Sequence, residues 1–156
     1  MKKILLAVSV VVSLSMAGDE NKVAYPNDYR TWTHLKSMVI NDAHSLSDPF
    51  EGIHHIYANK KALDGLKSNS YEDGATFVFD LLTAERTKEA TVEGKRKFIG
   101  VMLYDKTKYK KTGNWGFEAF AGDSNDKRVV KDSGVSCFQC HVGVENKSYV
   151  FSEYRK

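Results

Sequence analysis

Cysteine, proline and long apolar segments are all scarce in this 156-residue chain. Only two cysteines and two prolines are present, which excludes a disulfide-rich framework and a four-cysteine zinc site. After residue 17, no apolar run is long enough to cross a bilayer. The 23 basic and 20 acidic residues leave a net charge of +3, and this near balance gives no indication of nucleic-acid binding.

The chain begins with a segment typical of a secretory signal peptide. Two lysines precede an apolar run over residues 4–12, and small residues follow up to Ala17. The run is too short for a comfortable membrane anchor, so we expect cleavage after Ala17 and export to the periplasm. The sequence thus predicts a signal peptide over residues 1–17 and a single domain, without a membrane segment, over residues 18–156.

The two cysteines lie in the pentapeptide Cys137-Phe138-Gln139-Cys140-His141, which is typical of covalent c-type haem attachment. Each thiol can add to one vinyl group of haem, because the two-residue gap sets the sulfurs at about the separation of the vinyls. His141 then falls under the iron as an axial ligand. The motif predicts one haem c, with Cys137 and Cys140 as thioether donors and His141 as the metal ligand.

Other uses of two neighbouring cysteines fit the sequence less well. A thioredoxin-like redox pair would lie within a βαβ pattern, and none surrounds this motif. A structural disulfide across a two-residue gap would close a strained loop. The motif also lies near the C-terminal end, and no methionine follows it as a second iron ligand. Without a second strong ligand, the coordination of the iron would change on reduction, and this change would slow electron transfer. The sequence therefore argues against a simple electron carrier.

The residues before the motif predict an α+β domain with a largely antiparallel sheet and a few helices. Residues 29–40 show approximate helical spacing, Asn59 fits the N-cap of a helix ending near Ser68, and the charged residues 83–94 predict a loop. Runs rich in β-branched and aromatic residues predict strands over residues 52–57, 75–82, 98–104 and 115–120. These runs argue against the four-helix bundle of ordinary cytochromes c′.

Several motifs follow one another in a specific order after the signal peptide. They are Tyr25-Pro26-Asn27-Asp28-Tyr29-Arg30-Thr31-Trp32, Pro49-Phe50 leading into Ile56-Tyr57, Tyr71-Glu72-Asp73-Gly74-Ala75, Gly113-Asn114-Trp115-Gly116-Phe117 and the haem pentapeptide. The order resembles the cytochrome P-460 family, and specifically its cytochrome c′-beta branch. The resemblance implies a largely antiparallel sheet, a five-coordinate haem held by His141, and a homodimer.

The resemblance also separates two functions. Family members that oxidise hydroxylamine carry a lysine, in the strand after Asp-Gly-Ala, that cross-links to the porphyrin. The matching position here is Phe79, and the strand over residues 76–82 contains no lysine. Phe79 and Phe50 instead match the two phenylalanines that cap the distal haem face in cytochrome c′-beta. Without the resemblance, both would be interpreted as ordinary core residues.

An aromatic cap would govern which ligands the haem accepts. It excludes water and donates no hydrogen bond, so it disfavours oxygen, whose binding depends on distal donors. Nitric oxide binds ferrous haem strongly enough without them. The sequence therefore predicts a protein that binds nitric oxide and carbon monoxide, for capture, transport or detoxification, rather than an enzyme. The alternatives are an oxidoreductase acting on hydroxylamine or peroxide, for which the cap lacks acid–base groups, and an electron-transfer cytochrome.

A few further side chains have weaker support. His54 would share a strand face with Phe50 and could donate to a ligand or bind iron, although we expect a partly exposed strand histidine. Asp80 and Glu118 lie in strands and could relay protons, but nothing in the sequence places them at the haem. The basic residues could steer an acidic redox partner protein, and we expect them in solvated loops. They are Lys95, Arg96, Lys97, Lys106, Lys108, Lys110 and Lys111.

Overall fold

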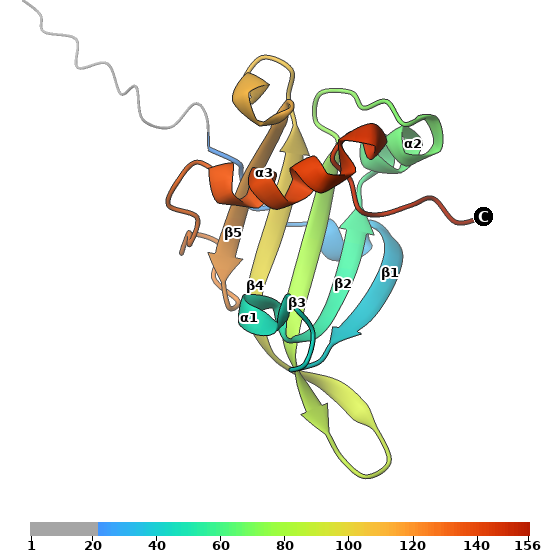
Figure 1. The fold of residues 1–156 in the computed structure, drawn as a ribbon, viewed down its shortest axis with the longest axis vertical. Coiled ribbons are helices and arrows are strands. Elements are labelled where there is room, and N and C mark those ends of the chain that lie inside the picture. Colours follow the sequence, from blue (N-terminus) through green and yellow to red (C-terminus); the bar gives the residue numbers. More distant parts are fainter. Residues whose placement is uncertain (1–21) are drawn as a thin grey trace, which may run out of the picture.

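The computed structural model describes residues 22–156, so the predicted signal peptide lies outside the described residues. One antiparallel sheet has the strand order β1-β2-β3-β4-β5, each strand pairing with the next along the chain (Figure 1). The strands are β1 (Thr33–Ile40), β2 (Gly52–Ala58), β3 (Thr76–Arg86), β4 (Thr91–Tyr104) and β5 (Trp115–Ala121). The helices are α1 (Ser47–Phe50), α2 (Lys60–Ser68) and α3 (Val135–His141), with 3-10 helices η1 (Tyr29–Thr31), η2 (Lys110–Thr112) and η3 (Val142–Lys147). The predicted α+β class is confirmed.

The predicted helix over residues 29–40 is wrong. Only η1 is helical there, and residues 33–40 form β1 at the edge of the sheet. A register shift between His34 and Lys36 interrupts the alternation of this strand. Ile40 is the only residue of β1 that is fully buried. The period-2 pattern that identifies a strand is therefore absent from this part of the sequence.

The predicted loop over residues 83–94 is also wrong, because β3 and β4 continue through it as a hairpin. Glu85 pairs with Val92 and Arg86 with Thr91. Figure 1 shows this hairpin extending beyond the rest of the sheet. Its side chains are mostly exposed, so nothing selects apolar residues there and the sequence looks like a loop.

The predicted helix after Asn59 is confirmed as α2. The Asn59 side chain accepts a hydrogen bond from the backbone N–H of Ala62 at 2.9 Å, as an N-cap residue does. The helix ends at Ser68, and Asn69 follows in the left-handed conformation. Within residues 22–156, no helix is long and apolar enough to span a membrane.

The two faces of the sheet are covered by different parts of the chain. We call the side covered by α1 and α3 the helix face; in Figure 1 both helices lie in front of the sheet. Its core contains Phe77, Met102, Trp115 and Phe117, against which Cys137 of α3 packs. We call the other side the opposite face. Its core contains Val23, Tyr29, Val78, Ile99, Val101 and Phe120.

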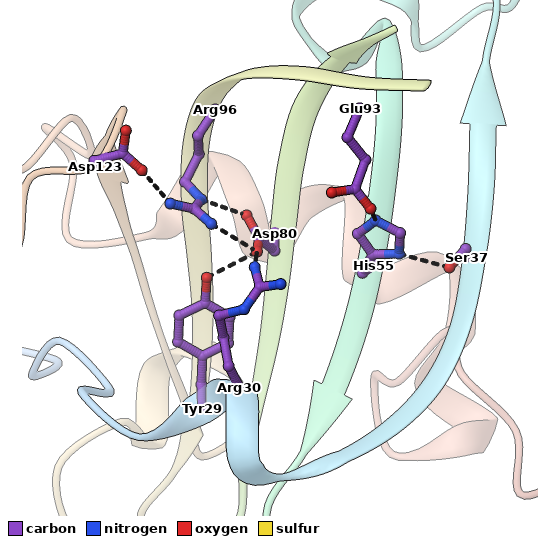
Figure 2. A network of polar contacts seen from close by, with 8 residues as sticks. All are labelled: Tyr29, Arg30, Ser37, His55, Asp80, Glu93, Arg96 and Asp123. Atoms are coloured by element: carbon purple, nitrogen blue, oxygen red, sulfur yellow. Dashed lines mark hydrogen bonds and ion pairs between the residues drawn. The ribbon is translucent and has the colours of Figure 1, made fainter. Parts of the chain in front are cut away.

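A fully buried carboxylate, Asp80, organises the opposite face (Figure 2). It accepts hydrogen bonds from Tyr29 Oη at 2.7 Å and Arg96 Nε at 2.7 Å, and it pairs with Arg30 at 3.3 Å. Burial and the neighbouring Asp80 raise the pKa of Tyr29, so the phenol keeps the proton that it donates. Arg96 also pairs with Asp123. The network joins η1 to the centre of the sheet.

Asp80→Asn is expected to lower the free energy of unfolding by about 3 kcal/mol, because the largely buried Arg96 would lose its buried anion and keep only the exposed carboxylate of Asp123. The Arg96 side chain is only 16% exposed. Asp64→Asn is the matched control, since Asp64 pairs with Lys60 and Lys67 on an exposed helix surface and should matter little. Denaturant unfolding of both variants tests this, and equal losses of stability would contradict it.

Candidate functional site

Helix α3 carries the three residues of the haem motif on about two turns. Its first turn is held by Asp132, whose carboxylate accepts hydrogen bonds from the backbone N–H groups of Ser136 at 2.8 Å and Gly134 at 3.1 Å. Cys137, Cys140 and His141 are spaced i, i+3 and i+4, so they share one side of the helix. Cys137 is half-buried, and burial raises the pKa of its thiol, while Cys140 is exposed.

The His141 imidazole is fixed by one hydrogen bond and two aromatic rings. Its Nδ1 lies 2.7 Å from the backbone carbonyl oxygen of Tyr149. A carbonyl can only accept, so Nδ1 carries the proton and the lone pair is on Nε2. The rings of Phe117 and Phe151 each lie 4.9 Å from the imidazole, centroid to centroid. Burial lowers the pKa of His141, which favours the neutral form that a metal ligand needs.

The turn that presents the Tyr149 carbonyl is held by Trp115. The indole Nε1 of Trp115 donates to the backbone oxygen of Ser148 at 3.0 Å, one residue before Tyr149. Trp115 itself is fully buried at the start of β5. The Gly113-Asn114-Trp115 motif therefore helps to position the group that orients His141. Sequence reasoning missed Tyr149, because a backbone carbonyl has no residue-type signal.

Near His141, whose ring contacts Phe117 of β5, the middle of the helix face is only half-buried. Phe79, Gly100 and Ala119 are register partners on β3, β4 and β5, and all three are half-buried. The preceding residues on β3 and β4, Val78 and Ile99, point to the opposite face and are 0% exposed. A Cβ at Gly100 would make only ordinary contacts, the nearest at 3.5 Å from Phe79 Cβ, so strand packing does not require glycine there. This apolar surface suits a flat macrocycle such as haem.

Three phenylalanines border this half-buried surface on the side of α1, which carries Phe50. Phe50 lies edge-on to Phe79 at 5.8 Å and to Phe98 at 5.9 Å, and Phe79 and Phe98 stack at 5.9 Å. We call these residues the phenylalanine trio. The structure thus brings Phe50 and Phe79 together, and their role as a haem cap stays a prediction. Phe98 was missed, although it begins a predicted strand two residues before Gly100.

Lys97 fixes the segment that carries Phe50. Its Nζ donates to the backbone oxygens of Pro49 at 2.8 Å and Glu51 at 2.9 Å, the two neighbours of Phe50. The expectation that residues 95–97 form a solvated loop is therefore wrong, because they belong to β4 and Arg96 is needed for the buried carboxylate of Asp80. The later lysines of the basic stretch are exposed, as expected: Lys106, Lys108, Lys110 and Lys111.

His54 differs from its predicted environment. It is 5% exposed rather than partly exposed, because its imidazole stacks on the Phe79 ring at 4.5 Å and 27°. Burial, together with Lys36 and His55, lowers the pKa of His54 to about 4. The adjacent His55 points to the opposite face, where it bonds Ser37 at 2.6 Å and Glu93 at 2.7 Å (Figure 2).

The two strand carboxylates are remote from the helix face. Asp80 belongs to the network of Figure 2, and Glu118 pairs with Arg128 at 2.7 Å. Glu118 pairs with Val101 of β4 in the register, so the two side chains lie on the same face of the sheet. Val101 belongs to the core of the opposite face. Neither carboxylate can therefore relay protons to a group bound on the helix face.

Comparison with known proteins gives one family. The family model described as Cytochrome P460 matches residues 26–152, a range that includes all five strands, the phenylalanine trio and the haem motif. A search of curated proteins found no match. The apolar surface and the oriented His141 also suit the haem that this family implies. The chain belongs to the cytochrome P460 family and is a haem protein.

Proposed function

We propose that the chain holds one covalently attached haem c on the helix face, with Cys137 and Cys140 as thioether donors and His141 Nε2 as the iron ligand. The hydrogen bond between His141 Nδ1 and the Tyr149 carbonyl carries this proposal. It fixes the tautomer and the ring orientation, and it makes Nε2 a better electron donor. A histidine used only for packing would not need this arrangement.

Haem, when bound, supplies an iron whose sixth position can take a diatomic gas. The phenylalanine trio supports such a use, because its three rings keep water away and offer no lone pair to the metal. Phe79 stands where hydroxylamine-oxidising relatives are expected to carry a cross-linking lysine. Asp80 and Glu118 face away, so they cannot supply the acid–base groups that peroxide chemistry needs.

The function that these residues support best is the binding of nitric oxide, and also of carbon monoxide, by a five-coordinate cytochrome of the c′-beta branch. We infer a role in the capture or transport of nitric oxide rather than an enzymatic role. The N-terminal sequence supports export to the periplasm. The resemblance to cytochrome c′-beta supports a homodimer. An acidic redox partner protein could approach the exposed lysines of residues 106–111.

Titration of the purified ferrous protein with nitric oxide and with carbon monoxide tests this function. Each gas is expected to change the absorption spectrum with a clear end point. A five-coordinate iron has no sixth ligand that the gas must displace, so only the phenylalanine side chains need to move aside. A six-coordinate electron-carrier cytochrome c, titrated alongside, should respond weakly to carbon monoxide. Hydroxylamine oxidation with an added electron acceptor should stay at background. A spectrum that ignores both gases, or rapid hydroxylamine turnover, would contradict the proposal.

A further inference from the structure

His54 stands out on the helix face because it is polar, buried and part of the aromatic cluster around Phe79. It lies on β2, opposite Leu81 of β3 and Met38 of β1 in the register. Its imidazole stacks on the Phe79 ring at 4.5 Å, and the Phe98 ring also stacks on Phe79, at 5.9 Å. His54 is therefore beside the very residue that is proposed to cap the haem.

The His54 Nδ1 atom is buried without a hydrogen-bond partner among residues 22–156. Folded proteins leave few buried polar atoms unpaired, since each unpaired atom destabilises the fold. Both ring nitrogens of the neighbouring His55, by contrast, have partners in Ser37 and Glu93. Packing against Phe79 does not require a nitrogen, because a phenyl ring would stack equally well. A role beyond packing would explain why an imidazole is kept here.

The chemistry of a neutral imidazole limits that role. One nitrogen carries a proton and can donate, and the other carries a lone pair. Burial and the positive charge of Lys36 disfavour the imidazolium form of His54, and the neighbouring His55 adds no anion that could hold it. The side chain is therefore available as a neutral donor within an otherwise apolar cluster. Such a donor is effective toward a small ligand because water does not compete there.

We propose that His54 determines which gases the haem prefers. It does so by donating a hydrogen bond from its imidazole N–H to a diatomic gas bound on the Phe79 side of the haem. This inference rests on the proposed function. It changes the expected behaviour of the pocket, because the phenylalanine trio alone would give a bound gas no donor. With His54, ligands that gain negative charge on binding are held longer.

Infrared spectra of the carbon monoxide complex test the inference directly. A hydrogen bond to the ligand oxygen lowers the C–O stretching frequency, so His54→Phe should shift the band to higher wavenumber. The same variant should release the gas about threefold faster, as expected for the loss of one modest hydrogen bond. His54→Gln should restore part of the shift, because its amide can donate. His55→Phe is the matched control on the opposite face and should leave the band unchanged.

Each outcome has one interpretation. If wild-type protein binds carbon monoxide and neither His54 variant moves the band, then His54 only packs and the inference is wrong, while the proposed function stands. If the ferrous wild type is six-coordinate and His54→Phe makes it five-coordinate, His54 is an iron ligand instead of a donor. If the wild type binds no gas, both proposals fail. Should His54→Phe not fold, His54→Gln and His54→Leu provide the same comparison of donor with non-donor.

Discussion

Replacement of both Cys137 and Cys140 with alanine is expected to remove covalently bound haem completely. These are the only cysteines in the chain, so no other thiol can form a thioether bond. Both lie on α3 with His141 one turn from Cys137, and this spacing lets one helix attach the macrocycle and ligate its iron. Among the predictions, this one has the largest expected effect, from full attachment to none.

Acid–acetone extraction and intact-protein mass spectrometry would measure the loss. The wild type should keep its haem in the protein fraction and show the added mass of one haem. Each single variant, Cys137→Ala or Cys140→Ala, should keep one thioether bond. Its haem attachment should therefore be intermediate between that of the wild type and that of the double variant. Ser136→Ala, next to the motif on the same helix, is the matched control and should retain full attachment. Haem that resists extraction from the double variant would refute the attachment proposal.

Phe79→Val is expected to speed carbon monoxide association by about tenfold or more. Phe79 contacts the rings of Phe50, Phe98 and His54, and each aromatic pair contributes about 0.5–1.5 kcal/mol. If a gas must displace this ring, the displacement raises the barrier by about 1.4 kcal/mol or more, which corresponds to about tenfold in rate. Valine suits a strand and removes the ring.

Flash photolysis of the carbon monoxide complex gives this rate. Phe120→Val is the matched control, because Phe120 is a fully buried phenylalanine on the opposite face. It should lower stability without changing the association rate. Association that is unchanged in Phe79→Val would mean that Phe79 is a core residue and not a cap, and the proposal that the phenylalanine trio covers the haem would then fail.

The parts of the fold that the sequence predicts are those whose cause is local. The haem motif is contiguous, so Cys137, Cys140 and His141 could be placed on one site from their spacing. The strands at the centre of the sheet could be predicted as well, since their side chains alternate or are continuously apolar. Asn59 caps α2 through its own neighbours, and that too is a local effect.

Most of the features that were missed depend on contacts between distant residues. The edge strand β1 is stabilised by pairing with β2, which its own sequence does not show. His54 is covered by the ring of Phe79, which lies 25 positions later in the numbering. Lys97 binds carbonyl oxygens around Phe50, and Tyr149 acts through its backbone. None of these groups has a residue-type pattern that sequence analysis could detect.

The spin state of the purified ferrous protein, read from its absorption spectrum before any gas is added, tests the central claim most directly. The claim is that His141 alone holds the iron, on a haem whose other face is covered by apolar rings. The predicted result is a high-spin, five-coordinate spectrum of an ordinary c-type haem. A low-spin, six-coordinate spectrum would contradict it and indicate a second ligand. A strongly red-shifted Soret band would contradict it differently, by indicating a modified haem and an oxidoreductase.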